Sequence, residues 1–336
     1  MDADVILEVS HLTVSFTTKR GTAKAVNDVS FTLHKGEILG LVGESGCGKS
    51  VTSKSLLRIL PDGITRVGGN VLYKGQDLLH LSQKEMAEYR GNRISMIFQE
   101  PMVSLDPLYS IGDQLREVIL SHKNVSRKEA DQKVLEMLRE VGIPSPEVRV
   151  RQYPFEMSGG MRQRVMIAMA LLLDPDILIA DEPTTALDVT IQAQILALLR
   201  RINQKFGTAI ILITHDLGVI AECADHVAVM YAGRIVEKAS VRDIFKHPRH
   251  PYTEGLLRSV PTMKSFKGEL PSIPGIVPSI YHLPEGCAFC DRCPYAMEIC
   301  RHGEVPEFLR EGSRVRCWKY RGEGDLCEKS FTKPEI

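Results

Sequence analysis

One eight-residue stretch constrains the fold of this chain more than any other feature. Residues 43–50 read GESGCGKS and fit the phosphate-binding pattern G-x-x-x-x-G-K-[ST]. A short apolar run, residues 37–42, leads into the stretch, and a helix is expected to begin at about Val51. Because glycines allow such a loop to wrap phosphates with its backbone N–H groups, this context predicts the strand, loop and helix of an α/β nucleotide-binding core.

The residues of this loop have distinct expected roles. Lys49 is expected to reach the β- and γ-phosphates of ATP, and the Ser50 hydroxyl is expected to ligate Mg²⁺. Cys47 occupies a position that the pattern leaves free, so the pattern gives its thiol no chemistry. The residues expected to contact the nucleotide are those of the loop and the first helical residue: Gly43, Ser45, Gly46, Cys47, Gly48, Lys49, Ser50 and Val51.

A second element supplies carboxylates for the metal and the reaction. Residues 177–180 are apolar and predict a buried strand, and Asp181 and Glu182 follow directly. Ligands of open α/β sheets bind at the carboxyl ends of the strands. Asp181 is therefore expected to position the Mg²⁺ shell, and Glu182 is expected to be the general base that polarises the attacking water.

Strand-like and helical patterns alternate along the first 246 residues. A second buried strand is expected at 209–213, a helix with an apolar face at 191–202, and a hairpin at 227–236. This order implies a mostly parallel sheet covered on both faces, preceded by an N-terminal antiparallel β subdomain. The stretch from about 100 to 165 is largely helical and is expected to be a subdomain inserted into the α/β core.

Composition narrows the class of protein. Lys plus Arg equals Asp plus Glu, 42 of each, so the chain has no basic excess for binding nucleic acid. The longest uninterrupted apolar run, residues 165–173, is far shorter than the roughly 20 residues that a membrane-spanning helix needs. The N-terminal sequence MDADVILEVS lacks the layout of a signal peptide, so the chain is expected to stay in the cytosol.

The composition changes near residue 246, which divides the chain into expected domains at 1–246 and 247–336. Seven prolines between His247 and Pro284 predict an extended connector without long helices. Six of the eight cysteines follow in the last fifty residues, at positions 287, 290, 293, 300, 317 and 327. In a cytosolic chain this uneven placement indicates a local metal site, and the spacing alone favours the triplet Cys287, Cys290 and Cys293 as ligands.

Together with further short motifs, these residues resemble the ATP-binding subunit of an ABC transporter. The additional motifs follow the order of that family: Gln99 within 97–101, Ser158-Gly159-Gly160, residues 186–188 and His215 within 213–216. Met157 and Met161 depart from the family pattern, which has leucine and glutamine there. The resemblance implies an ABC-type ATPase that works as a head-to-tail dimer, in which the Ser-Gly-Gly core of one subunit closes on the nucleotide of the other.

The resemblance also implies roles for three single residues. Gln99 corresponds to a Mg²⁺ ligand at the hinge to the helical subdomain. His215 corresponds to the switch histidine that contacts the γ-phosphate, so the expected catalytic residues are Lys49, Glu182 and His215. Phe16 lies where the family places an aromatic ring against adenine, although an apolar residue in an alternating strand also fits the core.

Two segments are similar to one group of that family. Residues 95–107 and the element His250-Pro251-Tyr252 resemble the dipeptide, oligopeptide and nickel importer ATPases, whose C-terminal extension begins at a His-Pro-Tyr element. The resemblance implies the extension's four ligands, without Cys290: Cys287, Cys293, Cys300 and Cys317. Their close spacing and the proline after Cys293 favour an iron–sulfur cluster of the [4Fe–4S] type, with zinc as the alternative.

The sequence therefore predicts a peripheral ATPase at the cytoplasmic face of the cell membrane that energises import of di- or oligopeptides. The resemblance implies as partners two transmembrane permease subunits, a second ABC ATPase subunit and an extracytoplasmic peptide-binding protein. Nickel import stays open, because no residue of this chain distinguishes the two substrates. A soluble ABC ATPase of repair, translation or iron–sulfur assembly is a further alternative, which the single ATPase module and the lack of a long heptad run disfavour.

Overall fold

The computed structural model describes residues 4–99, 104–185, 187–260 and 272–322. The chain forms two compact units. Unit 1 comprises residues 1–6, 33–38 and 77–213, and unit 2 comprises residues 7–32, 39–76 and 214–336. The chain passes between them several times, so each unit is built from segments that lie far apart in the sequence.

Unit 1 contains a parallel sheet at its centre. Three of its strands run in the order β6 (Ile94–Ile97), β7 (Ile177–Asp181) and β8 (Ala209–Thr214), with Ile177 of β7 paired to Ile94 on one side and Ala209 on the other. Every residue of β7 and β8 is buried, as expected for apolar strands covered on both faces. The strands predicted at 177–180 and 209–213 are confirmed, and the predicted helix between them is α8 (Val189–Phe206).

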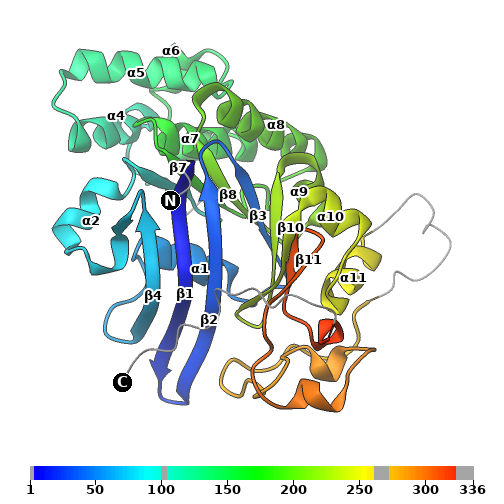
Figure 1. Ribbon diagram of the computed structural model, residues 1–336. Coiled ribbons are helices and arrows are strands. Elements are labelled where there is room, and N and C mark those ends of the chain that lie inside the picture. Colours follow the sequence, from blue (N-terminus) through cyan, green and yellow to red (C-terminus); the bar gives the residue numbers. More distant parts are fainter. Residues whose placement is uncertain (1–3, 100–103, 186, 261–271, 323–336) are drawn as a thin grey trace. The chain divides into compact units, whose positions relative to one another are not determined.

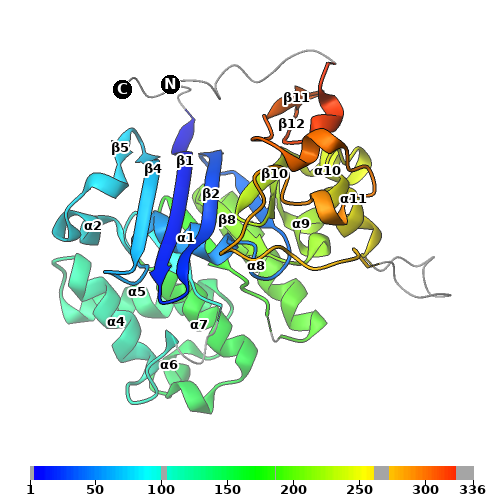
Figure 2. The same cartoon turned by 90° about the horizontal axis from the view of Figure 1, so that it is seen from below.

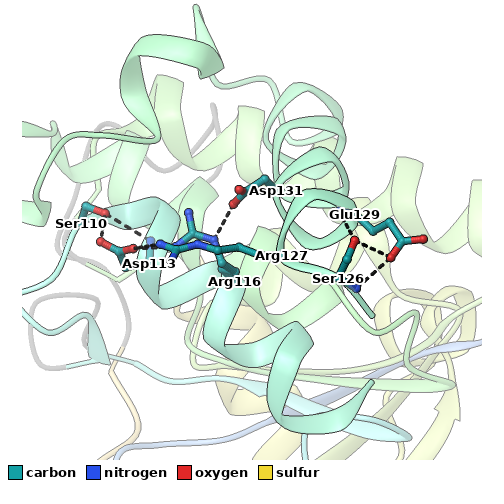
Figure 3. Close-up of polar contacts among 7 residues, drawn as sticks. All are labelled: Ser110, Asp113, Arg116, Ser126, Arg127, Glu129 and Asp131. Carbon is teal, nitrogen blue, oxygen red and sulfur yellow. Dashed lines mark hydrogen bonds and ion pairs between the residues drawn. The ribbon is translucent and has the colours of Figure 1, made fainter. Parts of the chain in front are cut away.

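The helical part of unit 1 matches the stretch predicted to be helical and continues slightly beyond it. Its helices lie together in Figure 1, in green: α4 (Ile111–His122), α5 (Arg127–Glu140), α6 (Pro146–Arg149) and α7 (Gly159–Leu171). Serines cap α4 and α5, and Ser126 forms a reciprocal capping box with Glu129 (Figure 3). Arg116 of α4 binds both Asp113 and Asp131, which ties α4 to α5. The described residues of the unit also form three short elements: η1 (Leu78–His80), α2 (Gln83–Tyr89) and η2 (Pro154–Glu156).

Unit 2 begins with the expected antiparallel sheet. Its strands run in the order β2 (Gly21–His34), β1 (Val5–Thr18), β4 (Thr65–Tyr73) and β5 (Gln76–Asp77). The first three lie side by side in Figure 1, and the register of β1 against β4 extends from Leu7 opposite Tyr73 to Phe16 opposite Thr65. Alternate residues of β2 face the core, as the period of a half-buried strand requires.

The second sheet of unit 2 holds the phosphate-binding loop at one end and the C-terminal residues at its edge. Its strands are β3 (Ile38–Val42), β9 (His226–Tyr231), β10 (Arg234–Ser240), β12 (Ser313–Val315) and β11 (Phe308–Arg310). β3 pairs with β9 in parallel, whereas the other neighbours are antiparallel. The predicted hairpin is confirmed: Ala232 and Gly233 join β9 to β10 with φ values of 45° and 82°, the left-handed pair that a two-residue hairpin favours.

The proline-rich segment differs from the prediction at its beginning. Residues 251–258 form an eight-residue helix, α11 (Pro251–Arg258), where an extended connector was expected. Pro251 occupies the first turn, where no N–H is needed for the helical ladder, and the His250 ring Nδ1 accepts the N–H of Tyr252. Residues 272–284 contain no helix or strand, in agreement with the prediction, and residues 261–271 lie outside the described residues.

The other helices in the described part of unit 2 are short: α1 (Lys49–Leu56), α9 (Leu217–Cys223), α10 (Val241–Lys246), and the 3₁₀ turns η3 (Cys290–Arg292), η4 (Glu298–Arg301) and η5 (Trp318–Tyr320). Figure 2 shows the C-terminal strands, in red, beside α10 and α11. Within the described ranges, no helix is long and apolar enough to cross a membrane.

Candidate nucleotide site and cysteine cavity

The phosphate-binding loop follows β3 directly and depends on its glycines. Gly43, Gly46 and Gly48 have φ values of 156°, 77° and 105°. A side chain at Gly43 would place its Cβ 2.1 Å from the carbonyl oxygen of Met230, and one at Gly48 would place it 2.5 Å from that of Ala25. The loop therefore keeps its curvature only with glycine at these positions. Helix α1 begins at Lys49, two residues before the predicted start at Val51.

Lys49 is held inside the curve of the loop. Lys49 is only 5% exposed, and its Nζ donates to the carbonyl oxygens of Gly43 at 2.7 Å and Glu44 at 3.1 Å. Burial raises the pKa of the neighbouring Cys47 thiol, against the opposing effect of the Lys49 ammonium 3.8 Å away. Cys47 is thus a buried, neutral residue of the loop itself, whereas Lys49 places a positive charge where phosphates are expected to bind.

In unit 1, two of the predicted site residues are in direct contact. Gln99 Nε2 donates to Oε2 of Glu182 at 3.1 Å, and the Thr185 hydroxyl donates to the same oxygen at 2.8 Å. Glu182 has a left-handed φ of 47°, and its N–H donates to the carbonyl oxygen of Ile213 in β8. A non-glycine residue in this conformation is strained, and such strain is frequent at functional sites. The two side chains fix the direction of the Glu182 carboxylate.

Asp181 ends β7 and is only 2% exposed, so its carboxylate lies at the carboxyl end of a fully buried strand. The Ser50 hydroxyl and the Asp181 carboxylate are oxygen donors, the ligand type that Mg²⁺ prefers. Ser50 belongs to the segment 39–76 of unit 2, and Asp181 belongs to unit 1. Their joint binding of one Mg²⁺ ion stays a prediction.

The Ser-Gly-Gly motif begins the thirteen-residue helix α7 in unit 1. The Ser158 hydroxyl caps the helix by accepting the N–H of Met161 at 3.3 Å. Ser158 and Gly159 are exposed, so this positive end of the helix dipole is open to an anion. A Cβ at Gly160 would lie 3.0 Å from Ile191 of α8, and glycine there permits the close packing of the two helices.

The two least specific predictions fall in unit 2. His215 follows β8 and is exposed, and Asp216 next to it caps α9 through the N–H of Gly218 at 2.7 Å. Phe16 lies in β1 opposite Thr65 and is half-buried, whereas Val14 on the same strand is completely buried. Phe16 is therefore not a full member of the core, and its contact with adenine stays a prediction. Residue 186 of the 186–188 motif lies outside the described residues.

Five cysteines line one small cavity in unit 2, together with His250, Phe289 and Trp318: Cys287, Cys290, Cys293, Cys300 and Cys317. The backbone draws two of them together, because the Cys287 N–H donates to the carbonyl oxygen of Cys300 at 2.7 Å. Gly286 permits this approach, since a Cβ there would lie 2.2 Å from the same oxygen. Cys327 lies outside the described residues.

Burial favours the neutral form of two thiols that line this cavity, those of Cys287 and Cys317. Burial raises the pKa of Cys287 to about 12 and that of Cys317 to about 11, and the neighbouring thiols reinforce both shifts. Among the described residues, no three His, Cys, Asp or Glu side chains form a ready metal-binding group. The donor set still suits a soft metal, because four or more sulfur atoms of one segment face a common space.

Sequence reasoning missed a contact between the C-terminal residues and the phosphate-binding loop. The Tyr252 hydroxyl accepts the N–H of Glu44 at 2.9 Å, and the Arg292 guanidinium binds the Glu44 carboxylate. The His-Pro-Tyr element was a signal for Tyr252, although only as a mark of resemblance. Arg292 had no signal, because nothing in the spacing of the cysteines distinguishes an arginine among them.

Two family profiles match the sequence. One is described as ABC transporter and matches residues 26–185, and the other, described as oligopeptide/dipeptide transporter, C-terminal region, matches residues 236–300. A probable peptide ABC transporter ATP-binding protein of Sinorhizobium fredii is 53% identical over 320 residues, which cover 94% of this chain and 96% of the relative. The dipeptide transport ATP-binding protein DppD of Bacillus subtilis is 54% identical over 315 residues, 93% of this chain and 94% of the relative.

Another relative is the oligopeptide transport ATP-binding protein OppD of Salmonella typhimurium, which is 51% identical over 317 residues, 94% of each chain. A dimeric ATP-binding cassette solved in a post-hydrolysis state with ADP and Pi matches with a TM-score of 0.63 and 25% identity, over 70% of this chain and 99% of that one. The cassette cbiO1 from Clostridium perfringens matches with a TM-score of 0.62 and 27% identity, over 73% and 92%. The described chain shares the mixed sheet and helices of these cassettes.

Proposed function

This chain belongs to the ABC transporter family, among the ATP-binding subunits of oligopeptide and dipeptide transporters, and from that premise we propose that it powers import of di- or oligopeptides. The single observation that carries the proposal is the similarity to peptide transport subunits over nearly the whole chain, including the C-terminal region. The proposed partners are two transmembrane permease subunits, a second ABC ATPase subunit and an extracytoplasmic peptide-binding protein. The proposed location is the cytoplasmic face of the cell membrane.

The geometry within each unit supports the proposed roles in ATP hydrolysis. Lys49 and the loop N–H groups bind the phosphates, because the loop concentrates donors and one ammonium around its curve. Ser50, Asp181 and Gln99 hold Mg²⁺, which supplies charge neutralisation when bound. Glu182 accepts the proton of the attacking water, and the hydrogen bonds from Gln99 and Thr185 support this role by orienting its carboxylate.

The proposed catalytic unit is a head-to-tail pair of ATPase subunits. The exposed N-terminus of α7, with Ser158, Gly159 and Gly160, closes on the γ-phosphate held by the partner. His215 contacts the same phosphate from the subunit that holds it, and its exposure after β8 is compatible with that role. Opening and closing of the pair then passes through the helical part of unit 1 to the permeases.

We also propose that residues 247–336 form a cysteine-rich extension to an ATPase domain at 1–246. The proposed ligands hold a [4Fe–4S] cluster, or zinc in the alternative: Cys287, Cys293, Cys300 and Cys317. The convergence of their thiols on one cavity supports the proposal, and a metal's positive charge would offset the raised pKa values of Cys287 and Cys317. The proposed role of such a centre is structural, since its ligands would join η3, η4 and the turn before η5.

The test uses the chain assembled with its permeases and binding protein in proteoliposomes. Import of labelled di- and tetrapeptides that requires ATP would support the proposal, and import of nickel without peptide would replace it. Glu182→Gln is expected to reduce ATP hydrolysis by about 10³-fold while ATP binding is retained, because the base is lost and the phosphate-binding loop is not. Hydrolysis at the wild-type rate by this variant would remove Glu182 from its role.

A further inference from the structure

Glu44, the second residue of the phosphate-binding loop, is bound by side chains that lie more than 200 positions away. Arg292 donates from Nη1 to Oε2 of Glu44 at 2.7 Å and from Nη2 to Oε1 at 3.0 Å, a bidentate pair. Tyr252 binds the backbone of the same residue through its hydroxyl. The loop is therefore fastened at Glu44 by both its side chain and its N–H.

The site that receives Glu44 is built around Arg292. The arginine side chain is 5% exposed, and its remaining N–H groups donate to the carbonyl oxygens of Pro274 at 2.9 Å and Ile273 at 3.2 Å. The guanidinium also lies over the rings of Tyr231 and Phe289, 5.7 and 5.9 Å from their centroids. These contacts hold the guanidinium independently of Glu44, so its N–H groups are already oriented for the carboxylate.

The charge of Glu44 gives this contact a consequence for nucleotide binding. A carboxylate in a loop that binds phosphates repels them unless a cation neutralises it. The carbonyl oxygen of Glu44 also accepts a hydrogen bond from Lys49 Nζ, so the placement of Glu44 affects the lysine as well. Arg292 thus acts at two points, on the electrostatic field of the loop and on its shape.

We propose that Arg292 is a positioning residue for ATP binding: it neutralises and fixes Glu44, so that the cysteine-rich extension forms part of the nucleotide site. The proposal rests on the proposed phosphate-binding role of the loop and is independent of which substrate is imported. Arg292 lies between Cys290 and Cys293 in the sequence. The contact with Glu44 therefore depends on a well-defined conformation of the cysteine-rich segment.

The experiment measures the dissociation constant of trinitrophenyl-ATP with Mg²⁺ on the purified full-length chain. Arg292→Gln is expected to weaken binding about tenfold, because the Glu44 carboxylate is left without its counter-ion. Arg292→Lys is expected to fall between this variant and the wild type, since an ammonium keeps the charge but not the fork. Glu44→Gln alone is expected to have a smaller effect than Arg292→Gln.

The double variant Arg292→Gln/Glu44→Gln distinguishes a role of Arg292 in neutralising Glu44 from a role in folding alone. If Arg292 acts by neutralising Glu44, removing both charges restores most of the lost affinity, so the double variant binds more tightly than Arg292→Gln. If the arginine only supports folding, the double variant binds no better than the single one, and the proposal is overturned. Wild-type affinity in Arg292→Gln would overturn it equally.

A matched control and a second variant keep the test decisive. Arg301 lies in the same cysteine-rich segment and pairs with Asp291 on the surface, so Arg301→Gln removes one positive charge from the segment and is expected to change the dissociation constant by less than about twofold. If Arg292→Gln does not fold, Tyr252→Phe removes one hydroxyl at the second contact and is expected to weaken binding about threefold. Unchanged binding by Tyr252→Phe in that case would also overturn the proposal.

In the assembled transporter, Arg292→Gln is expected to raise the KM for ATP about tenfold and to change kcat by less than about twofold, because Glu182 and its partners are untouched. Binding to the purified chain involves neither permease nor peptide. A transporter that imports no peptide would therefore refute the proposed function while the binding data still test Arg292, and the reverse also holds.

Discussion

The phosphate-binding loop and the cysteine-rich segment are both short parts of unit 2, but they are assembled from different groups. Backbone atoms and glycines form the loop, and two of its own carbonyl oxygens hold Lys49. Side chains form the cysteine cavity, and burial raises the pKa of its Cys287 thiol to about 12. An anion site made of backbone N–H groups needs no further charge to form, whereas the proposed metal would supply the charge that favours thiolates in the cysteine cavity.

The largest expected effect tests the loop. Lys49→Ala is expected to weaken binding of Mg·ATP about 100-fold, because the ammonium that faces the phosphates is lost. The iron or zinc content of the purified chain should not change, since the cysteine cavity does not use Lys49. Equilibrium binding and metal analysis on the same sample measure both; loss of metal in this variant would show that the two regions are not separately assembled.

The next effect tests the cysteine-rich segment. Protein purified without oxygen is expected to be brown with about four irons per chain, and Cys300→Ser is expected to lose this colour and to expose the segment to proteolysis. Cys290→Ser, in the same cavity, is the matched control and should keep both the colour and the resistance. One zinc per colourless chain would replace the cluster but keep the ligands. A brown Cys300→Ser with a bleached Cys290→Ser would favour the triplet Cys287, Cys290 and Cys293.

The smallest expected effect concerns His250, which borders the cavity. Burial lowers its pKa from 6.5 to about 3, so the folded protein keeps the ring neutral while an unfolded chain takes up a proton as the pH falls below 6.5. The stability that this group contributes is therefore complete above pH 6.5 and is lost below it, by about 2 kcal/mol between pH 6.5 and pH 5. Denaturation by urea across this pH range measures the loss.

His250→Asn is the matched variant for that measurement, because an asparagine oxygen can accept the Tyr252 N–H as the ring Nδ1 does. The variant should show a correspondingly flatter decline of stability with falling pH. Burial raises the pKa of the neighbouring Glu237, so that carboxyl stabilises the fold as the pH falls and opposes the histidine. An equal decline in wild type and variant would show that His250 is not the group responsible.

Local patterns were sufficient to predict much of the fold. The strands that became β7 and β8, the β9–β10 hairpin and the loop after β3 each follow from residues within a dozen positions of one another. The prediction of an extended connector missed the helix that begins at Pro251. Proline was counted as a helix breaker, whereas the first turn of a helix accepts it. The contact of Gln99 with Glu182 follows the order of the motifs, but its geometry needed the structure.

The contacts of Arg292 could not be predicted from the sequence. Its pairing with Glu44 spans 248 positions, and neither residue departs from the ordinary pattern of its own segment. Hydrophobic periodicity indicates which face of a helix or strand is buried. It does not indicate which residues far apart in the sequence form an ion pair. The preorganised guanidinium is visible only when Ile273, Pro274 and the two aromatic rings are placed around it.

The hydroxyl of Tyr252 has a consequence for engineering. The Tyr252 hydroxyl accepts the Glu44 N–H, so the contact between the extension and the loop needs residues from both. A chimera that takes the extension from one relative and the ATPase core from another would have to transplant Glu44 together with Tyr252 and Arg292. An exchange at the apparent boundary near residue 246 would take Glu44 from one relative and its two partners from the other. The segments to exchange are therefore better chosen by these contacts than by a single position in the chain.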